Sequence, residues 1–207
     1  APPAFAHVSL VMGPDHSPLS KRHGATSVTE FRARGYLPEA LTNYLSLIGW
    51  SPGEGQELLP LDELARRFQL EDVGHSAGVY DVEKLAWVNR HYLKLAEPER
   101  LVRLCTPYLK GEGWVLDPTS AGFDFLAAVV PLAAGSVDRL DQVPARLRFL
   151  FDYSAARALE DPSVRAEADA ARPVIAALVD ILAGGASLTD RDAFRAVVGQ
   201  VRERTGH

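Results

Sequence analysis

The chain has 207 residues, of which 47% are hydrophobic, and its formal net charge at pH 7 is −5. This length can bury a substantial core, and the acidic balance excludes nucleic-acid binding through bulk positive charge, so such binding requires a local basic patch. The only cysteine, Cys105, excludes an internal disulfide framework, and we expect it to be a small buried residue on a helix.

The N-terminal segment is predicted to form a short half-buried strand. Between residues 5 and 12, apolar side chains alternate with His7 and Ser9, which is the pattern of a strand with one covered face. The sequence Gly-Pro-Asp at residues 13–15 ends it. The loop "SPLSKRHGATSV" follows at residues 17–28 and leads into a helix, whose start is marked by Ser27 and Glu30 at the capping-box spacing.

The rest of the chain has mostly helical periodicity, so the predicted fold class is mainly α. Proline and acidic residues at 97–99 mark one helix start, and Thr189 with Asp192 marks the last one. Short helices with tight glycine turns give way near residues 95–100 to longer helices typical of a bundle. Helices are expected near residues 28–34, 38–48, 61–68, 82–92, 97–108, 122–133, 137–150, 161–183 and 189–204.

The loop at residues 17–24 is the first candidate binding site. Lys21 is a compact charge beside the planar guanidinium of Arg22, and Gly24 permits a tight turn. Such a loop suits phosphate oxygens or the developing charge of a pyrophosphate. Taken alone, however, these residues favour a solvated cationic turn.

Two further groups of residues are candidates for nucleic-acid contacts. Lys84, Trp87 and His91 share one side of a predicted helix and could meet a phosphate backbone or stack on a sugar, although burial of Trp87 between helices is the commoner arrangement. The arginines of the helical stretch after residue 135 could contact phosphates or bases, or form a solvated face with ion pairs. These are Arg139, Arg146 and Arg148. The six scattered histidines predict no metal site, and no motif of a self-contained active site is present.

Three motifs together resemble the bacterial glutamyl-tRNA synthetases. They are "LSKRHGATSV" at residues 19–28, "RARGYLPEALTNYLSLIGWS" at 32–51 and "DVEKLAWVNRHYL" at 81–93, and the likeness extends more loosely through "VPARLRFLFDY" at 143–153. The first is similar to the lysine-serine-lysine signature loop of class I synthetases. The other two are similar to the region that contacts the inner corner of tRNA in that family.

The resemblance implies a division of the chain and a reaction. Residues 1–24 would be the tail of a Rossmann-type catalytic domain with a strand remnant, 25–97 a helical stem-contact domain, and 98–207 an anticodon-binding helical bundle. The family activates glutamate with ATP and Mg²⁺ and transfers it to the terminal adenosine of tRNA. Lys21 would be the catalytic residue that stabilises the triphosphate and the departing pyrophosphate, with Ser20 and Arg22 beside it at the ATP phosphates. The residues expected to contact tRNA are Lys84, Trp87, His91, Ser136, Arg139 and Arg146.

Two positions depart from the family pattern. Pro18 stands where the signature loop has its first lysine, so the loop carries one charge fewer. Ser136 stands where members that select the third anticodon base carry an arginine, and serine lacks the bidentate guanidinium fork. Relaxed discrimination between glutamate and glutamine tRNAs is the resulting hypothesis.

The ATP-binding histidine signature and the amino-acid pocket of the family would lie before residue 1, and a last anticodon subdomain after residue 207. We therefore expect a cytoplasmic, monomeric fragment with no membrane association, which binds tRNA but is catalytically inactive alone and holds neither ATP nor Mg²⁺. The alternative is a helical protein-interaction module whose cationic loop docks a protein or is inert.

Overall fold

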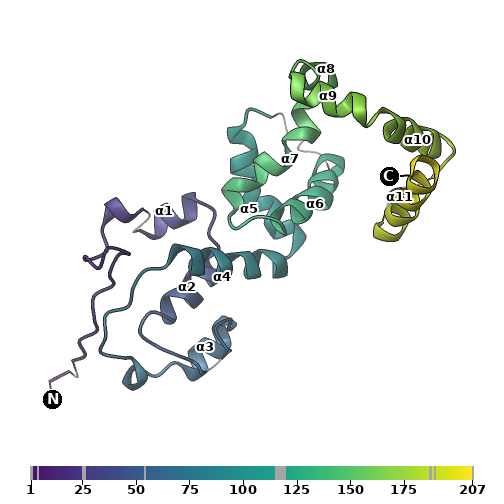
Figure 1. Cartoon of the computed structure of the whole chain (residues 1–207). Coiled ribbons are helices and arrows are strands. Elements are labelled where there is room, and N and C mark those ends of the chain that lie inside the picture. The colour runs from purple at the N-terminus through teal and green to yellow at the C-terminus, as the bar shows by residue number, and fades with distance from the viewer. Residues whose placement is uncertain are drawn as a thin grey trace. The chain divides into compact units, whose positions relative to one another are not determined.

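The computed structural model describes residues 2–3, 5–24, 27–53, 55–114, 120–186, 188 and 190–206, which form two compact units, residues 1–151 and 152–207. The helices of the first unit are η1 (Lys21–His23), α1 (Val28–Ala33), α2 (Pro38–Ser46), α3 (Leu61–Arg67), η2 (Leu70–Asp72), α4 (Val82–Leu95), α5 (Pro98–Gly111), α6 (Ser120–Ala134), η3 (Leu140–Gln142) and α7 (Val143–Asp152) (Figure 1). The second unit contains α8 (Ala155–Ala158), α9 (Pro162–Ala170), α10 (Arg172–Ala183) and α11 (Arg191–Thr205). The mainly-α prediction is confirmed.

Local capping explains where several helices begin. At α1, the backbone N–H of Glu30 donates to Ser27 Oγ (3.2 Å) and the N–H of Ser27 donates to Glu30 Oε2 (3.0 Å), which is the predicted capping box. At α4, Asp81 accepts the N–H of Lys84 at 3.0 Å. Pro98 occupies the first turn of α5, where its missing N–H needs no partner.

The predicted N-terminal strand is wrong. Residues 5–11 form no strand, and Phe5, Val8 and Leu10 are 81%, 67% and 68% exposed. Within the described residues the only bridges outside helices join Met12 to Pro18 and to Val79. An alternating pattern makes a strand only when a second strand takes up its backbone groups, and before Met12 the described residues show one such backbone bond, from the N–H of Leu19 to the carbonyl of Val11.

Two helices also differ from the prediction. The helix expected at 161–183 is interrupted at Ala171, because Pro173 has no N–H for a helical bond and its ring obstructs the preceding turn. The helix expected from 137 begins as η3 and becomes α-helical only at Val143, with the Gln142 side chain accepting the N–H of Asp138 at 2.9 Å. The last helix starts after Asp190; the predicted cap Thr189 lies outside the described residues.

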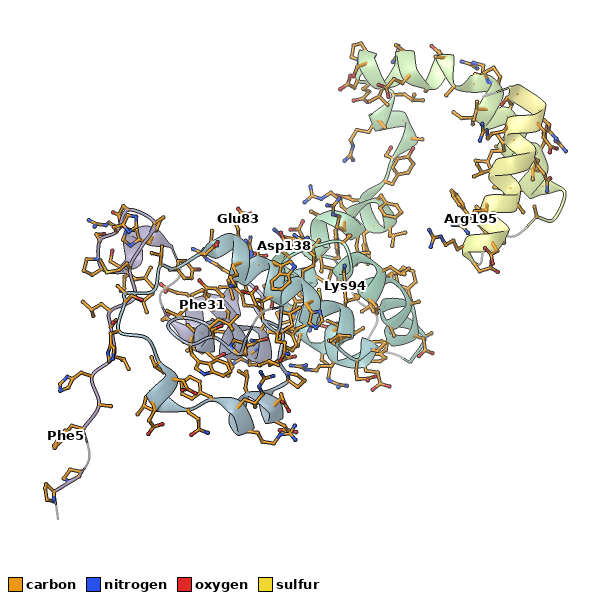
Figure 2. All side chains as sticks on the ribbon, turned by 60° about the horizontal axis from the view of Figure 1, so that its bottom comes forward. Phe5, Phe31, Glu83, Lys94, Asp138 and Arg195 are labelled. Atoms are coloured by element: carbon orange, nitrogen blue, oxygen red, sulfur yellow. The ribbon has the colours of Figure 1, made fainter. Side chains whose placement is uncertain are left out.

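The larger apolar core of the first unit contains buried side chains from Phe31 to Leu147, and a smaller cluster gathers Trp50, Leu59 and Leu64. Figure 2 shows Phe31 within the helical body and Phe5 on the extended segment away from it. Cys105 is fully buried in the larger core, as predicted, and burial raises the pKa of its thiol to about 12. This core includes helices on both sides of residue 97; the boundaries expected at residues 24 and 97 stay predictions.

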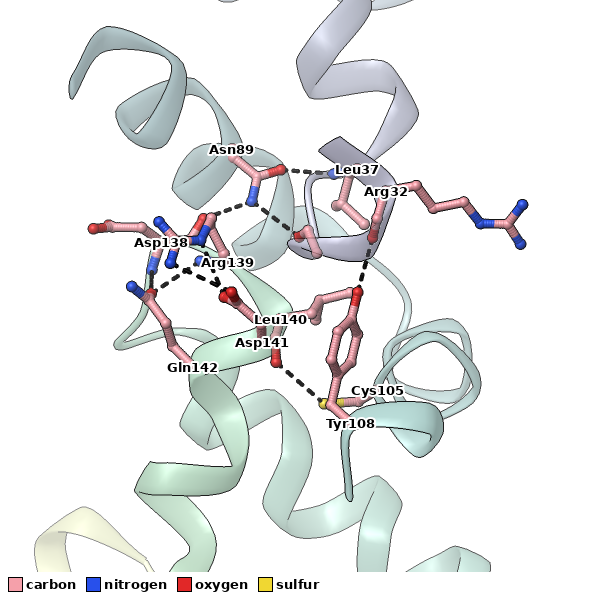
Figure 3. Close-up of polar contacts among 11 residues, drawn as sticks. Arg32, Leu37, Asn89, Cys105, Tyr108, Asp138, Arg139, Leu140, Asp141 and Gln142 are labelled. Atoms are coloured by element: carbon pink, nitrogen blue, oxygen red, sulfur yellow. Dashed lines mark hydrogen bonds and ion pairs between the residues drawn. The ribbon is translucent and has the colours of Figure 1, made fainter. Parts of the chain in front are cut away.

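A buried amide joins three segments of this core (Figure 3). Asn89 is fully buried; its Oδ1 accepts the N–H of Leu37 at 2.8 Å, and its Nδ2 donates to the carbonyls of Asp138 (2.5 Å) and Gly35 (3.4 Å). Gly35 has a φ of +82°, and a Cβ there would lie 2.6 Å from the backbone nitrogen of Leu140. The turn before α2, the inner face of α4 and the start of η3 therefore form one tightly constrained junction.

In the second unit, α10 and α11 pack through a small cluster around Ile181, Val197 and Val201. Among the helices of the described ranges, none combines the length and apolarity that crossing a bilayer requires.

Candidate functional site

The cationic loop is anchored to the segment that enters α4. Met12 donates its N–H to the carbonyl of Gly78 (2.9 Å) and accepts the N–H of Tyr80 (2.7 Å). The N–H of Leu19 donates to the carbonyl of Val11 at 2.9 Å, which returns the chain beside the same segment. The loop is thereby attached through its N-terminal side to the residues just before the Asp81 cap of α4.

Residues 20–24 form a tight turn that presents Lys21. Ser20 is extended (φ −148°, ψ 170°), and its carbonyl accepts the N–H of His23 at 2.8 Å. Gly24 ends the turn with a φ of +110°, a conformation that L side chains rarely adopt. Lys21 is exposed, and no carboxylate in the described part of the chain pairs with its ammonium. The turn therefore holds one unpaired cation toward solvent.

Arg22 has a different environment from its neighbour. Its Nη2 donates to Ser17 Oγ at 2.6 Å and lies 3.5 Å from the carboxylate of Asp15. The Ser17 hydroxyl and N–H both donate to Asp15 Oδ1, at 2.7 and 3.0 Å, and these hydrogen bonds hold the pKa of Asp15 below its usual range. Arg22 thus braces the loop against the preceding turn.

His23 is a loop residue that sequence reasoning missed. Its side chain is only 7% exposed, its Nδ1 lies 3.0 Å from the N–H of Ser20, and its Nε2 lies 3.1 Å from Asp15 Oδ1. The ring packs on Gly13, where a Cβ would lie 2.9 Å from it. The signal in the sequence was the three-residue spacing from Ser20 to His23, which allows a side chain to reach back to the start of a turn.

Arg34 is a second neighbour that the sequence did not reveal. A Cβ added at Gly24 would lie 3.5 Å from Arg34 Nη1, so this guanidinium is beside the end of the loop. It lies ten residues further along the chain, after α1, and only the fold brings it there.

The three candidate residues on α4 differ in how available their side chains are to a ligand. Lys84 Nζ pairs with Glu57 Oε1 at 2.6 Å, so its charge is already partly compensated. Trp87 is 42% exposed, so the alternative of burial between helices does not apply to it. His91 is half-buried and packs edge-to-face on Tyr92 with ring centroids 5.4 Å apart.

The candidates after residue 135 differ in whether their side chains already have partners. Ser136 is exposed and its hydroxyl donates to the carbonyl of Ala133 at 2.8 Å. Arg139 pairs with Asp141 (3.0 Å) and lies over the ring of Tyr36, beside the Asn89 junction. Arg146 is exposed on α7. Arg148, in contrast, pairs with Glu112 at 2.6 Å.

The geometry of the loop suits an anion rather than a metal. Lys21 offers a mobile ammonium on a fixed backbone, which is how a point charge meets phosphate oxygens. Mg²⁺ requires several oxygen ligands, whereas the nearby carboxylate of Asp15 is already engaged by Ser17 and His23. The described loop residues therefore fit the phosphates of a nucleotide and supply no metal site.

Comparison with known proteins shows which family the chain resembles. A family model described as "tRNA synthetases class I (E and Q), catalytic domain" matches residues 1–87, which include the whole loop and the first part of α4. The glutamate–tRNA ligase of Desulforamulus reducens is 35% identical over 205 residues, covering 99% of this chain. The glutamate–tRNA ligase of Moorella thermoacetica is 43% identical over 150 residues, covering 72% of the chain. The chain belongs to the glutamyl-tRNA synthetase family.

The family relationship covers only part of each relative. The chain spans 42% of the Desulforamulus reducens protein and 31% of the Moorella thermoacetica protein. A crystal structure of a glutamate tRNA ligase from Elizabethkingia meningosepticum in complex with its amino acid has the same fold over 99% of this chain, with a TM-score of 0.71 and 21% identity, and the match covers 43% of that structure. The family match to the catalytic domain extends beyond residue 24, where the resemblance placed its end.

Proposed function

We propose that the chain is part of a glutamate–tRNA ligase, which joins glutamate to tRNA through a glutamyl-adenylate made from ATP and Mg²⁺. Within that enzyme the segment supplies the pyrophosphate-stabilising loop and a helical tRNA-binding surface, in a monomeric cytoplasmic protein. The observation that carries this proposal is the unpaired, exposed Lys21 on a fixed turn, in a chain of this family. In the described part of the chain, no feature singles out a protein-interaction module instead.

The loop residues have separate roles in this proposal. Lys21 binds the triphosphate and stabilises the negative charge that develops on the departing pyrophosphate, because a positioned cation is most effective where charge increases in the transition state. Ser20 begins the turn, and its hydroxyl, which lies 3.3 Å from His23 Nδ1, would turn toward the phosphates when they bind. Arg22 braces the loop through Ser17 and Asp15, and its remaining N–H groups would contact the same anion.

The tRNA surface is proposed on α4 and on the segment around η3. Trp87, His91 and Arg146 are accessible for stacking or phosphate contacts. Lys84 and Arg139 would exchange their carboxylate partners for phosphates, so they contribute less to affinity than unpaired cations would.

Ser136 carries the proposal on tRNA choice. It is exposed, and its hydroxyl is directed to its own turn, so it offers no bidentate donor to an anticodon base. We propose that glutamine tRNA is also accepted for this reason.

ATP–pyrophosphate exchange by the complete ligase tests the role of Lys21. Replacing Lys21 by Ala is expected to slow exchange by roughly 10²–10³-fold, the usual effect of removing one preorganised electrostatic donor. The matched control is Lys110→Ala, which removes an exposed cation from α5. Equal exchange rates for the Lys21 variant and the control would refute the proposal.

A further inference from the structure

We propose that His23 is a positioning residue that fixes the turn carrying Lys21, by bridging the backbone of Ser20 to the carboxylate of Asp15. This inference rests on the proposed function, since the turn matters for the reaction only if Lys21 does. It is drawn from three contacts of one nearly buried ring.

The first contact determines which nitrogen of the ring carries a proton. The N–H of Ser20 donates to Nδ1 at 3.0 Å, and a backbone N–H can only donate, so Nδ1 is unprotonated. A neutral imidazole then carries its proton on Nε2. That nitrogen lies 3.1 Å from Asp15 Oδ1 and donates to it.

The second contact shows that the bridge is charge-assisted. Asp15 accepts both the hydroxyl and the N–H of Ser17, so it is an ionised acceptor for the His23 proton. Arg22 Nε also lies 3.3 Å from His23 Nε2, but a donor cannot bond to a protonated nitrogen, so the guanidinium is held by Ser17 and Asp15 instead. Asp15 and Arg22 are the charged groups that contact the ring.

The third contact is steric. Gly13 is buried, and a Cβ at that position would lie 2.9 Å from the ring of His23. The ring is therefore wedged between the chain that pairs with Gly78–Tyr80 and the turn that presents Lys21. The bridge sets the distance between these two segments before any nucleotide binds.

Loss of the His23 bridge is expected to affect the rate of adenylate formation rather than the affinity for the nucleotide. Without the bridge, the flexible Lys21 side chain can still find a phosphate, but its backbone is no longer fixed where charge develops. A displacement of about 1 Å at a positioned group can cost on the order of 10²-fold in rate. Loss of His23 is therefore expected to lower kcat for adenylate formation, with a much smaller change in KM for ATP.

Three substitutions separate the two hydrogen bonds of the ring. His23→Ala removes both. His23→Asn keeps an acceptor near the position of Nδ1 and so retains the bond from Ser20, whereas His23→Gln keeps a donor near the position of Nε2 and retains the bond to Asp15. His75→Ala removes an exposed histidine and is the control.

The experiment measures ATP–pyrophosphate exchange by the complete ligase, with Lys21→Ala as reference. We expect roughly a 10- to 100-fold lower kcat for His23→Ala, partial recovery in the Asn variant, and no change for His75→Ala. If Lys21→Ala is slow but His23→Ala is normal, the positioning role is overturned while the proposed function stands. If Lys21→Ala is itself normal, the proposed function fails and the role of His23 in the reaction fails with it.

A structural measurement on the 207-residue chain tests the bridge without activity. Long-range proton–nitrogen NMR spectra at about pH 8, where a free imidazole is neutral, are expected to show His23 protonated on Nε2 only. Hydrogen exchange at the Ser20 amide is expected to accelerate in His23→Ala and to stay slow in His23→Asn. A proton on Nδ1, or an unprotected Ser20 amide in the unaltered chain, would overturn the inference.

Discussion

Replacing Asn89 by Ala removes the amide that joins the turn before α2, the inner face of α4 and the start of η3. Three backbone groups lose a partner: the N–H of Leu37 and the carbonyls of Asp138 and Gly35. The Gly35 carbonyl still accepts the N–H of Leu140 at 3.2 Å. The N–H of Leu37 and the carbonyl of Asp138 are therefore the two groups left without the hydrogen bond that Asn89 supplied.

The magnitude follows from those two groups. A buried donor or acceptor without a partner costs about 1–3 kcal/mol, so the two together are expected to lower the free energy of unfolding by roughly 2–6 kcal/mol. This is a large fraction of the roughly 5–15 kcal/mol that stabilises a typical domain. Asn89→Leu, which retains side-chain volume, is expected to lose nearly as much, because the loss arises from hydrogen bonds and not from a cavity.

Urea unfolding followed by tryptophan fluorescence measures this loss. The three tryptophans, Trp50, Trp87 and Trp114, all lie in the first unit, so the signal reports that unit. Arg90→Ala is the matched control: it removes an exposed ion pair to Asp138 from the same helix and is expected to cost less than about 1 kcal/mol. Equal, small losses for the Asn89 and Arg90 variants would refute the reasoning.

Three further outcomes are expected. Gly35→Ala is expected to destabilise the chain far more than Gly55→Ala in the same urea titration. Both glycines have a positive φ, but only at Gly35 would a Cβ meet backbone atoms, those of Leu140. Equal losses would contradict the close contact between Gly35 and Leu140. Cys105 is expected to resist thiol reagents until the chain unfolds. Its pKa of about 12 in the fold exceeds the ordinary value of 9.0, so the free energy of unfolding is expected to fall as pH rises from about 9 toward 12. Cys105→Ala is expected to reduce this slope, and the same pH profile in the variant would contradict the reasoning. Ser136→Arg raises the ratio of glutamate-tRNA to glutamine-tRNA charging by the complete ligase, and an unchanged ratio would refute the proposal on tRNA choice.

Helix starts could be predicted from the sequence because capping is local. The bonds between Ser27 and Glu30 span three residues, and Pro98 marks its helix by itself. The N-terminal strand could not be predicted in the same way, because a strand depends on a partner elsewhere in the chain. The long helix at 161–183 was predicted whole because its apolar periodicity outweighed the one proline, Pro173, that interrupts it.

In the candidate site, too, local features could be predicted from the sequence and contacts between distant residues could not. Lys21 was identified through a contiguous motif, and the structure places it on an exposed turn without a carboxylate partner among the described residues. The pairing of Lys84 with Glu57, 27 residues away, depends on the fold and was not predictable. The Asp15–His23 bridge was missed because the tight turn after Gly13 brings the carboxylate back onto the ring.

Binding of the 207-residue chain to glutamate tRNA, measured over a range of salt concentrations, tests most directly whether this acidic protein is a tRNA-binding part of the ligase. Binding through phosphates releases counterions, so the association constant is expected to fall steeply as salt increases. At low salt, tRNA is expected to bind more tightly than an unrelated acidic polymer such as heparin. Equal affinity for the two polymers, or no detectable binding to tRNA, would contradict the proposed function.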